Sequence, residues 1–359
     1  MRMLFVTKKI GNRGGGYVIT QRNKQVLCEL LGAENVDTYE IKDKPKTISV
    51  LYDRCTKAYV GGLDKDCIHE LMDKSTGMDV VWIDGSFLGT ISKELRINGY
   101  KGRIITFFHN VEKFFCKRSL LQQVLYPFFN GPLVRSEINA INYSNHVVTL
   151  TSRDADYVHK VNSVVKITLM PSSMDDQFED KGDYLKASVL EAKSPLKLLF
   201  VGSYFYANVS GITWFVNKVL PFVDATLTIV GANMERLPFE NSEKLKIHGF
   251  VEDLGLFYRD ADAVVAPIFE GSGMKTKTTE ALMWGKFVFG TDEAFCGFRI
   301  NEEVGICCNT ANEFISSLNR IAYTGIRRFN FVSRELFLHE YSNEKAKDIL
   351  RRILQDGGF

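Results

Sequence analysis

The segment from Pro267 to Thr291 carries residue types that are well suited to binding a phosphate. An apolar strand pattern runs into Gly271-Ser272-Gly273, and a helical pattern follows from about Lys275. The first amides of a helix lack partners within the helix and lie at the positive end of its dipole, so they attract anions. Glycines let the backbone approach such an anion closely. The sequence therefore predicts a phosphate site at this strand–helix junction.

Lys277 and Glu280 follow the glycine turn and, three residues apart, share one face of the predicted helix. Lys277 can add a point charge to the bound phosphate. The carboxylate of Glu280 can accept hydrogen bonds from the two hydroxyls of a ribose. A tight turn ahead of a solvated helix is the alternative interpretation, and the added lysine and glutamate make it the weaker one.

His109 ends a strand pattern, which is where α/β folds place their binding crevice. We interpret it as functional, with a satisfied structural histidine as the alternative. The six histidines show neither metal-ligand spacing nor an HExxH motif. The pairs Asp154/Asp156 and Asp260/Asp262 resemble acidic metal triplets, but we interpret both as structural. The sequence predicts no metal site and no cofactor.

Buried strand patterns alternate with helical patterns along the chain, which favours parallel sheets covered by helices. A polar, acidic stretch at 175–195 interrupts the alternation and is typical of a connector. We therefore predict two α/β domains, at 1–190 and 191–334, followed by a helical tail at 335–359 that packs back on the first domain. The predicted strands are 1–6, 80–83, 103–108, 146–150, 197–201, 226–230, 245–248, 263–266 and 286–289.

The composition narrows the class of protein. The chain has 359 residues and a formal net charge of +2, which argues against a dedicated nucleic-acid binder. Its 7 cysteines are irregularly spaced, which favours reduced thiols and a cytoplasmic location. Neither a signal-peptide pattern nor an apolar stretch of membrane-spanning length is present.

The pattern from Gly271 through Lys277 and Glu280 to Thr291 resembles the C-terminal domain of family 4 (group 1) glycosyltransferases. Two further stretches resemble the same family, Phe200 to Ser203 and His248 to Asp253. The N-terminal half is similar more loosely, through the Gly14 to Gly16 loop, the strand ending at His109, and Ser136-Glu137. The resemblance implies a GT-B fold, in which two Rossmann-like domains face each other across a cleft. It also implies transfer of a sugar from a nucleoside-diphosphate sugar, mostly with retention and without a bound metal.

The resemblance assigns roles to individual residues. Glu270, Lys277 and His109 would be catalytic, with Glu270 contacting the donor sugar and His109 lying beside it. Glu280 would bind the ribose, and Lys277 would pair with the diphosphate. The remaining donor-binding residues implied are Gly14, Gly15, Gly16, Gly202, Ser203, His248, Phe250, Val251, Gly271, Ser272 and Gly273.

Two features depart from the family pattern. The family separates its pair of acids by seven residues, whereas nine separate Glu270 from Glu280 here, which leaves the role of Glu270 open. Many relatives carry a basic residue soon after the strand that ends at Gly202. This chain has none there before Lys218, so Lys275 or Lys277 would supply the charge.

The basic and apolar stretch 113–135 fits contact with a membrane surface, which would suit a lipid-linked acceptor, but core packing or a dimer contact explains it equally well. Family analogy places such a transferase in bacterial surface-polysaccharide or glycoconjugate synthesis, with a glycan, lipid-linked or other acceptor. A non-catalytic GT-B subunit and a GT-B sugar-nucleotide epimerase are the rival interpretations. The sequence does not identify the base, the sugar, the acceptor or the oligomeric state.

Overall fold

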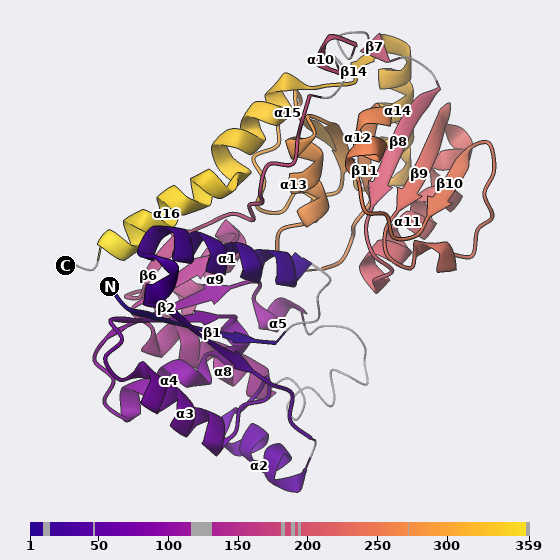
Figure 1. Ribbon diagram of the computed structural model, residues 1–359. Coiled ribbons are helices and arrows are strands. Elements are labelled where there is room, and N and C mark those ends of the chain that lie inside the picture. The colour runs from indigo at the N-terminus through magenta and orange to yellow at the C-terminus, as the bar shows by residue number, and fades with distance from the viewer. Residues whose placement is uncertain are drawn as a thin grey trace. The chain divides into compact units, whose positions relative to one another are not determined.

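The chain forms two compact units, each built on one parallel sheet (Figure 1). Unit 1 consists of Met1–Pro171 with Ala346–Phe359, and unit 2 of Ser172–Lys345. These limits differ from the domain boundaries at 190 and 334 expected from the sequence. The computed structural model describes residues 1–9, 15–45, 47–115, 131–180, 184–187, 191–192, 195–271 and 273–356.

The sheet of unit 1 has the strand order β2-β1-β3-β4-β5-β6, with every neighbouring pair parallel. Its central strands are continuous apolar runs, as expected for parallel strands that are buried on both faces. The strands are β1 (Met3–Lys8), β2 (Val36–Ile41), β3 (Val80–Asp84), β4 (Arg103–Phe108), β5 (His146–Thr149) and β6 (Lys166–Leu169). The helices are α1 (Gly15–Leu31), α2 (Ile48–Lys57), α3 (Lys65–Ser75), α4 (Thr90–Ile97), α5 (Glu112–Phe115), α8 (Gly131–Tyr143), α9 (Ser152–Val161) and α16 (Asn343–Gln355), with 3₁₀ turns η1 (Ala33–Asn35) and η2 (Ser86–Leu88).

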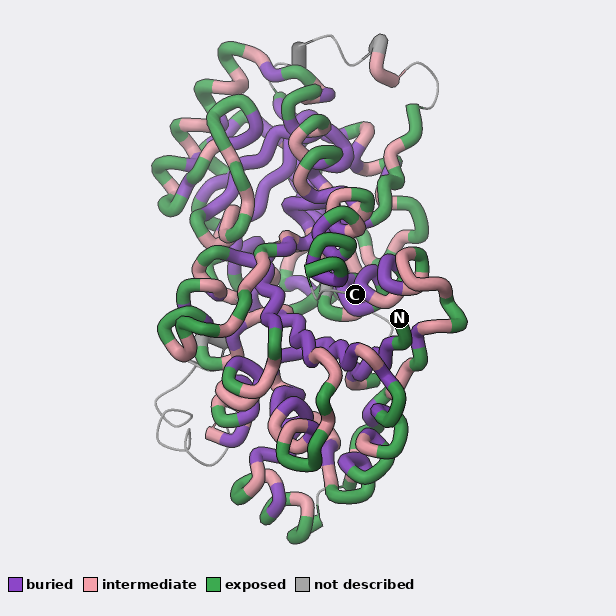
Figure 2. Tube along the Cα trace, turned by 90° about the vertical axis from the view of Figure 1, so that its left-hand side faces the viewer, coloured by how far each residue is buried: buried purple, intermediate pink, exposed green. Residues whose placement is uncertain are grey.

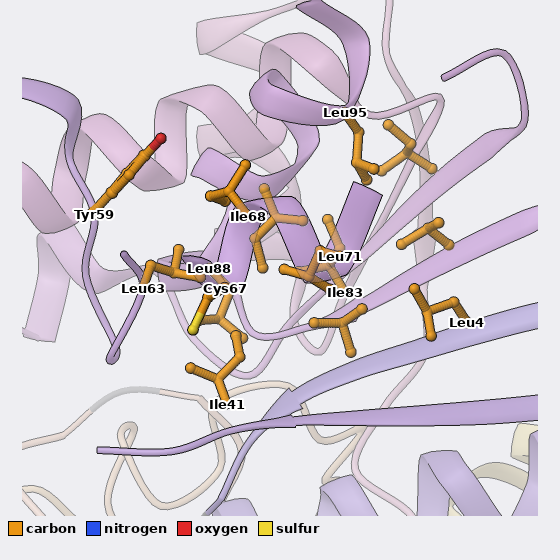
Figure 3. Packing of buried hydrophobic residues seen from close by; sticks show 14 of the residues in the cluster. Leu4, Ile41, Tyr59, Leu63, Cys67, Ile68, Leu71, Ile83, Leu88 and Leu95 are labelled. Atoms are coloured by element: carbon orange, nitrogen blue, oxygen red, sulfur yellow. The ribbon is translucent and has the colours of Figure 1, made fainter. Parts of the chain in front are cut away.

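One face of the unit 1 sheet packs against α3 and α4, whereas α1 lies on the other side (Figure 1). Leu4 and Ile83 from the strands meet Ile68 and Leu71 of α3 and Leu95 of α4 in one buried cluster (Figure 3). Because β1, β3 and β4 pair in parallel, their carboxyl ends lie at one edge of this sheet.

Unit 2 repeats this architecture with the strand order β10-β9-β8-β11-β12-β13, again parallel throughout. Buried residues follow its strands, and exposed ones follow the outer faces of its helices (Figure 2). The strands are β8 (Leu196–Val201), β9 (Ala225–Val230), β10 (Leu245–His248), β11 (Ala263–Ala266), β12 (Phe287–Gly290) and β13 (Gly305–Cys307), beside a small antiparallel pair, β7 (Glu191–Ala192) and β14 (Ile326–Arg327). The helices are α10 (Tyr184–Ala187), α11 (Tyr206–Lys218), α12 (Gly255–Asp260), α13 (Thr276–Met283), α14 (Ala311–Thr324) and α15 (Phe331–Leu336), with 3₁₀ turns η3 (Leu220–Phe222) and η4 (Met234–Arg236).

The first part of the predicted connector packs on unit 2. Phe178 lies 5.6 Å from Trp284 and 5.2 Å from Phe329, measured between ring centroids. Arg334 forms an ion pair with Asp176 and donates a hydrogen bond to the carbonyl of Met283. Packing of the Phe178 ring thus holds this part of the stretch against unit 2, although its polar, acidic composition predicted a connector.

The C-terminal tail, predicted as helical over 335–359, is not one continuous helix. A π-turn at Phe337–Tyr341 follows α15, and Ser342 is extended before α16 begins. Ile349, Leu350 and Ile353 of α16 are buried. Arg103, at the start of β4, donates hydrogen bonds of 3.0 and 2.8 Å to the carbonyls of Leu354 and Ile353. This cation therefore satisfies orphan carbonyls at the C-terminal end of the helix.

Replacing Arg103 with alanine is expected to loosen α16. A hydrogen bond to a charged group contributes about 1.5–3 kcal/mol, and the lower value is about tenfold in an opening equilibrium. Amide hydrogen exchange should therefore become about tenfold faster across residues 346–356. Arg351→Ala, which removes an exposed ion pair with Asp348 on the same helix, is the control and should leave exchange nearly unchanged. Equal exchange in both variants would contradict the capping role.

Candidate active site

The glycine turn of unit 2 has the backbone shape that its sequence requires. From β11 the chain passes Pro267 and the buried Ile268, and α13 begins at Thr276. Gly271 and Gly273 have φ values of 136° and 65°, a region that side chains with a Cβ rarely adopt. Ser272 lies outside the described residues. The turn thus brings glycine backbone next to the N-terminus of α13.

Lys277 lies buried where this helix meets the end of β8. Its Nζ donates a hydrogen bond to Oδ1 of Asn208 and lies 4.7 Å from the ring centroid of Phe200. A Cβ on Gly202 would come within 3.2 Å of the same Nζ, so a larger residue would crowd the ammonium group. Burial lowers the pKa of Lys277 to about 7, against the opposing effect of Glu280. An anion placed here would favour the charged form.

Glu280 lies one turn further along α13. Its Oε2 accepts a hydrogen bond of 3.1 Å from the hydroxyl of Tyr258, which is fully buried and stacked on Trp284. Burial raises the pKa of Glu280 to about 7, although Tyr258 and Lys277 both favour its ionised form. A rigid aromatic pair therefore fixes this carboxylate.

Lys275 is neutralised within the loop. Its Nζ forms an ion pair of 2.7 Å with Glu293 and a hydrogen bond of 2.8 Å with the carbonyl of Gly273. The hydroxyl of Thr278 donates to the carbonyl of Ala294, which ties α13 to the loop after β12. Of the two lysines that the sequence offered for the missing charge, Lys277 is the one next to Gly202.

The other residues predicted in unit 2 lie at the carboxyl edge of the same sheet, His248 at the end of β10 and the rest on the loops after the strands. Gly202 and Ser203 follow β8, and the carbonyl of Ser203 accepts a hydrogen bond of 2.9 Å from Asn208. The carbonyl of His248 accepts from Gly231, and its ring packs on Phe257. The sequence predicted four further residues at this edge, and of these Phe250 and Glu270 are exposed while Val251 and Gly271 are partly exposed.

His109 of unit 1 forms a buried polar cluster with residues that the sequence analysis missed. Its Nε2 lies 2.9 Å from Oδ2 of Asp84, at the ends of β4 and β3. Asp84 also accepts from the Thr20 hydroxyl at 2.6 Å and the Asn23 amide at 2.7 Å, both on α1, and from the Trp82 indole at 3.2 Å. Burial alone would raise the pKa of Asp84, but His109, Thr20 and Asn23 outweigh it and hold the pKa below its usual value.

The contact with Asp84 changes how the predicted role of His109 is interpreted. The ring directs Nε2 toward Asp84, so the histidine acts as half of an Asp–His pair rather than as an isolated side chain. The sequence offered two signals for this cluster. Asp84 ends an apolar strand, and Thr20 and Asn23 are polar residues on the inner face of α1. Gly15 and Gly16 begin α1, whereas Gly14 lies outside the described residues.

Ser136 and Glu137 of α8 hold the loops around this pair. The Ser136 hydroxyl donates to the carbonyl of Phe87 at 2.7 Å, and Glu137 accepts from the amide of Glu112 at 2.6 Å. Glu137 therefore caps α5, which follows His109. Most of the predicted membrane-contact stretch, 116–130, lies outside the described residues.

The contacts of Asp260 and Asp262 fit the structural role predicted for that acidic pair. Asp260 pairs with the ammonium of Lys197, and Asp262 accepts from the Lys197 amide and pairs with Arg328. Among the described residues, His, Cys, Asp and Glu form no group of three or more that could hold a metal. No helix in the described ranges has the length and apolar character needed to cross a membrane.

The family comparison decides the class of the second unit. The model for glycosyl transferases group 1 matches residues 195–322. These residues form a group 1 glycosyl transferase domain. The match confirms the resemblance seen in the sequence and the assignment of the chain as a glycosyltransferase. In sequence, none of the curated proteins matches the chain.

Solved structures confirm the GT-B fold over nearly the whole chain. Sucrose-phosphate synthase from Thermosynechococcus elongatus is 14% identical, with a TM-score of 0.72 and 99% of each chain covered. HepE from Anabaena, in complex with UDP and glucose, is 12% identical, with a TM-score of 0.68 and 99% of each chain covered. A trehalose-6-phosphate synthase studied for glycosyl transfer with retention is 12% identical, with a TM-score of 0.59 and 99% of each chain covered.

Proposed function

We propose that this glycosyltransferase takes a sugar from a nucleoside-diphosphate sugar and transfers it, with retention and without a metal ion, to a glycan, lipid-linked or other acceptor. The observation that carries the proposal is the placement of Lys277. It is a buried ammonium that hydrogen bonds to the neutral Asn208 and lies beside Gly202 and the helix that follows the glycine turn.

Breaking a sugar–phosphate bond builds negative charge on the departing diphosphate. Fixed donors aimed at that charge stabilise the transition state, and they act most strongly where water is excluded. Lys277 and the amides preceding α13 would supply those donors, and Glu280 would hold the ribose. The UDP and glucose in the HepE structure and the retention named for the trehalose-6-phosphate synthase support the donor class and the stereochemistry.

By family analogy alone, we propose bacterial surface-polysaccharide or glycoconjugate synthesis as the setting of the reaction. A non-catalytic subunit would bind the nucleotide without turning it over. An epimerase would interconvert donor sugars without needing an acceptor.

A panel of nucleoside-diphosphate sugars tests the proposal. One donor should raise the unfolding temperature, since a ligand at a hundred times its dissociation constant stabilises by about 2.7 kcal/mol. The same donor should be hydrolysed slowly or transferred to added acceptors, and excess EDTA should not abolish turnover. Failure of every donor at millimolar concentration would contradict the proposal. Epimerised donor would favour the rival reaction, and an EDTA-sensitive activity restored by manganese would contradict the metal-free mechanism.

A further inference from the structure

The proposed donor carries more negative charge than the residues described so far can neutralise. Lys277 is the cation beside Gly202, and Glu280 lies within its electrostatic reach. Lys275 is already paired with Glu293. The residues after β8, from Gly202 to Phe205, include no basic side chain. A second cation at this edge of the sheet would therefore have to come from another loop.

Arg236 approaches the loop after β8 from the neighbouring strand. Its guanidinium carbon lies 4.7 Å from the ring centroid of Tyr204, a cation–π contact that holds the exposed side chain over that ring. Arg236 ends the turn η4, which follows β9. Met234 in this turn is fully buried, and the amide of Arg236 donates to the carbonyl of Asn233 at 3.2 Å. The guanidinium therefore extends from a fixed turn.

The backbone brings this turn close to Gly202. The amides of Gly202 and Tyr204 donate to the carbonyls of Val230 and Ala232, at 3.0 and 2.9 Å. A Cβ on Gly231 would lie 2.0 Å from the carbonyl oxygen of Gly202, so the two loops touch backbone to backbone. Lys277 contacts the same loop at Gly202, and Arg236 contacts it two residues further on, at Tyr204.

Among the residues that the structure describes, no ion pair involves Arg236. The adjacent Glu235 turns toward Gly249, where a Cβ would lie 2.6 Å from its Oε2. A guanidinium held by its turn, with no acidic partner in the described part of the chain, suits an oxyanion that it can bind through two N–H groups.

We propose that Arg236 is a second cation for the diphosphate of the donor and replaces the basic residue absent from the loop after β8. The ring of Tyr204 holds the guanidinium in place through the cation–π contact. The inference rests on the proposed function, because it requires a nucleoside-diphosphate ligand. Lys277 and Arg236 then bind the diphosphate from two sides of the Gly202–Tyr204 loop.

Calorimetry on Arg236→Ala tests the inference, using whichever of UDP, GDP and ADP binds the unaltered protein most tightly, together with its monophosphate. Diphosphate affinity should fall about tenfold. This is the lower end of the range for a hydrogen bond to a charged group, and we expect the lower end because Arg236 is exposed. Monophosphate affinity should stay within about threefold. Tyr204→Leu should give a smaller loss, and Lys218→Ala, which removes an exposed charge at the end of α11, should give none.

Three outcomes would overturn the inference. Unchanged diphosphate affinity in Arg236→Ala would leave the donor site without this cation, while the proposed function stood. Equal losses for the monophosphate and the diphosphate would move Arg236 to the ribose or base. If none of the three diphosphates bound the unaltered protein, the proposed function and this inference would fail together.

Discussion

Replacing His109 with alanine is expected to lower the rate of sugar transfer about 100-fold, in the range assigned to a positioned proton-transfer or polar group. The affinity for the free nucleoside diphosphate should stay within about threefold, because the proposed diphosphate ligands, Lys277 and the glycine turn, belong to unit 2. A steady-state assay beside calorimetry separates the two effects. His159→Ala, which removes an exposed histidine from α9, is the matched control.

Asp84→Asn sharpens this prediction because it keeps the volume of the side chain and removes its charge. The carboxylate accepts hydrogen bonds from His109, Thr20 and Asn23 in the buried cluster. An amide has one acceptor oxygen in place of two, so it cannot satisfy all of these donors. We expect Asp84→Asn to slow transfer at least tenfold, again with little change in nucleotide affinity.

NMR of the His109 imidazole nitrogens tests whether Asp84 orients this ring. In the unaltered protein, the nitrogen NMR shifts of His109 should show a proton on Nε2, the atom that faces Asp84. In Asp84→Asn this preference should weaken. Normal transfer rates in His109→Ala would remove it from the catalytic residues, and an unchanged imidazole spectrum in Asp84→Asn would remove Asp84 as its positioning group.

The sequence predicted the central strands of both sheets and missed three edge strands. β3, β4 and β11 are apolar runs buried on both faces, so their residues identify them directly. β2, β6 and β13 lie at sheet edges, where β2 and β13 mix buried and exposed residues irregularly and β6 has no buried residue. Hydrophobic pattern alone could not distinguish them from loops, because their position depends on a neighbouring strand that is distant in the chain.

The site residues also divide into those that the sequence predicted and those that only the structure shows. Lys277, Glu280 and the glycine turn lie within one short segment, so their spacing carried the prediction. Asn208, Tyr258 and Asp84 reach their partners only through tertiary packing, across 69, 22 and 25 residues of chain. Asp84 at least ends an apolar strand, whereas no local pattern distinguishes Asn208 or Tyr258 from ordinary polar residues. Only the folded structure shows their roles, because it brings them into hydrogen-bonding distance of Lys277, Glu280 and His109.

Lys277→Ala should weaken nucleoside-diphosphate binding by roughly 10- to 150-fold, corresponding to the 1.5–3 kcal/mol of a hydrogen bond to a charged group. Turnover should fall as well, because the departing diphosphate gains charge in the transition state. Glu280→Ala should mainly raise the Michaelis constant, since the ribose does not change during the reaction. Unchanged nucleotide affinity in both variants would contradict the site assignment.

The pH dependence of binding tests the same lysine with its side chain in place. Burial lowers the pKa of Lys277 to about 7, so most of the free protein carries a neutral amine at pH 8. A bound diphosphate favours the ammonium, so binding must take up a proton, and the association constant should fall by up to about tenfold per pH unit above 7. Calorimetry in buffers of different ionisation enthalpy measures that uptake directly.

Two variants isolate Lys277 from its neighbours. Burial raises the pKa of Glu280 to about 7, so it titrates in the same range, and its ionisation on raising the pH should strengthen ribose binding and oppose the trend. Glu280→Gln removes that contribution and should leave the proton uptake intact. Lys277→Arg keeps the charge at every pH in the range, because a guanidinium stays protonated, and should abolish the uptake. If proton uptake persisted in Lys277→Arg, the titrating group would have to be sought among other residues, and Lys277 would lose its role as the proton-coupled diphosphate ligand.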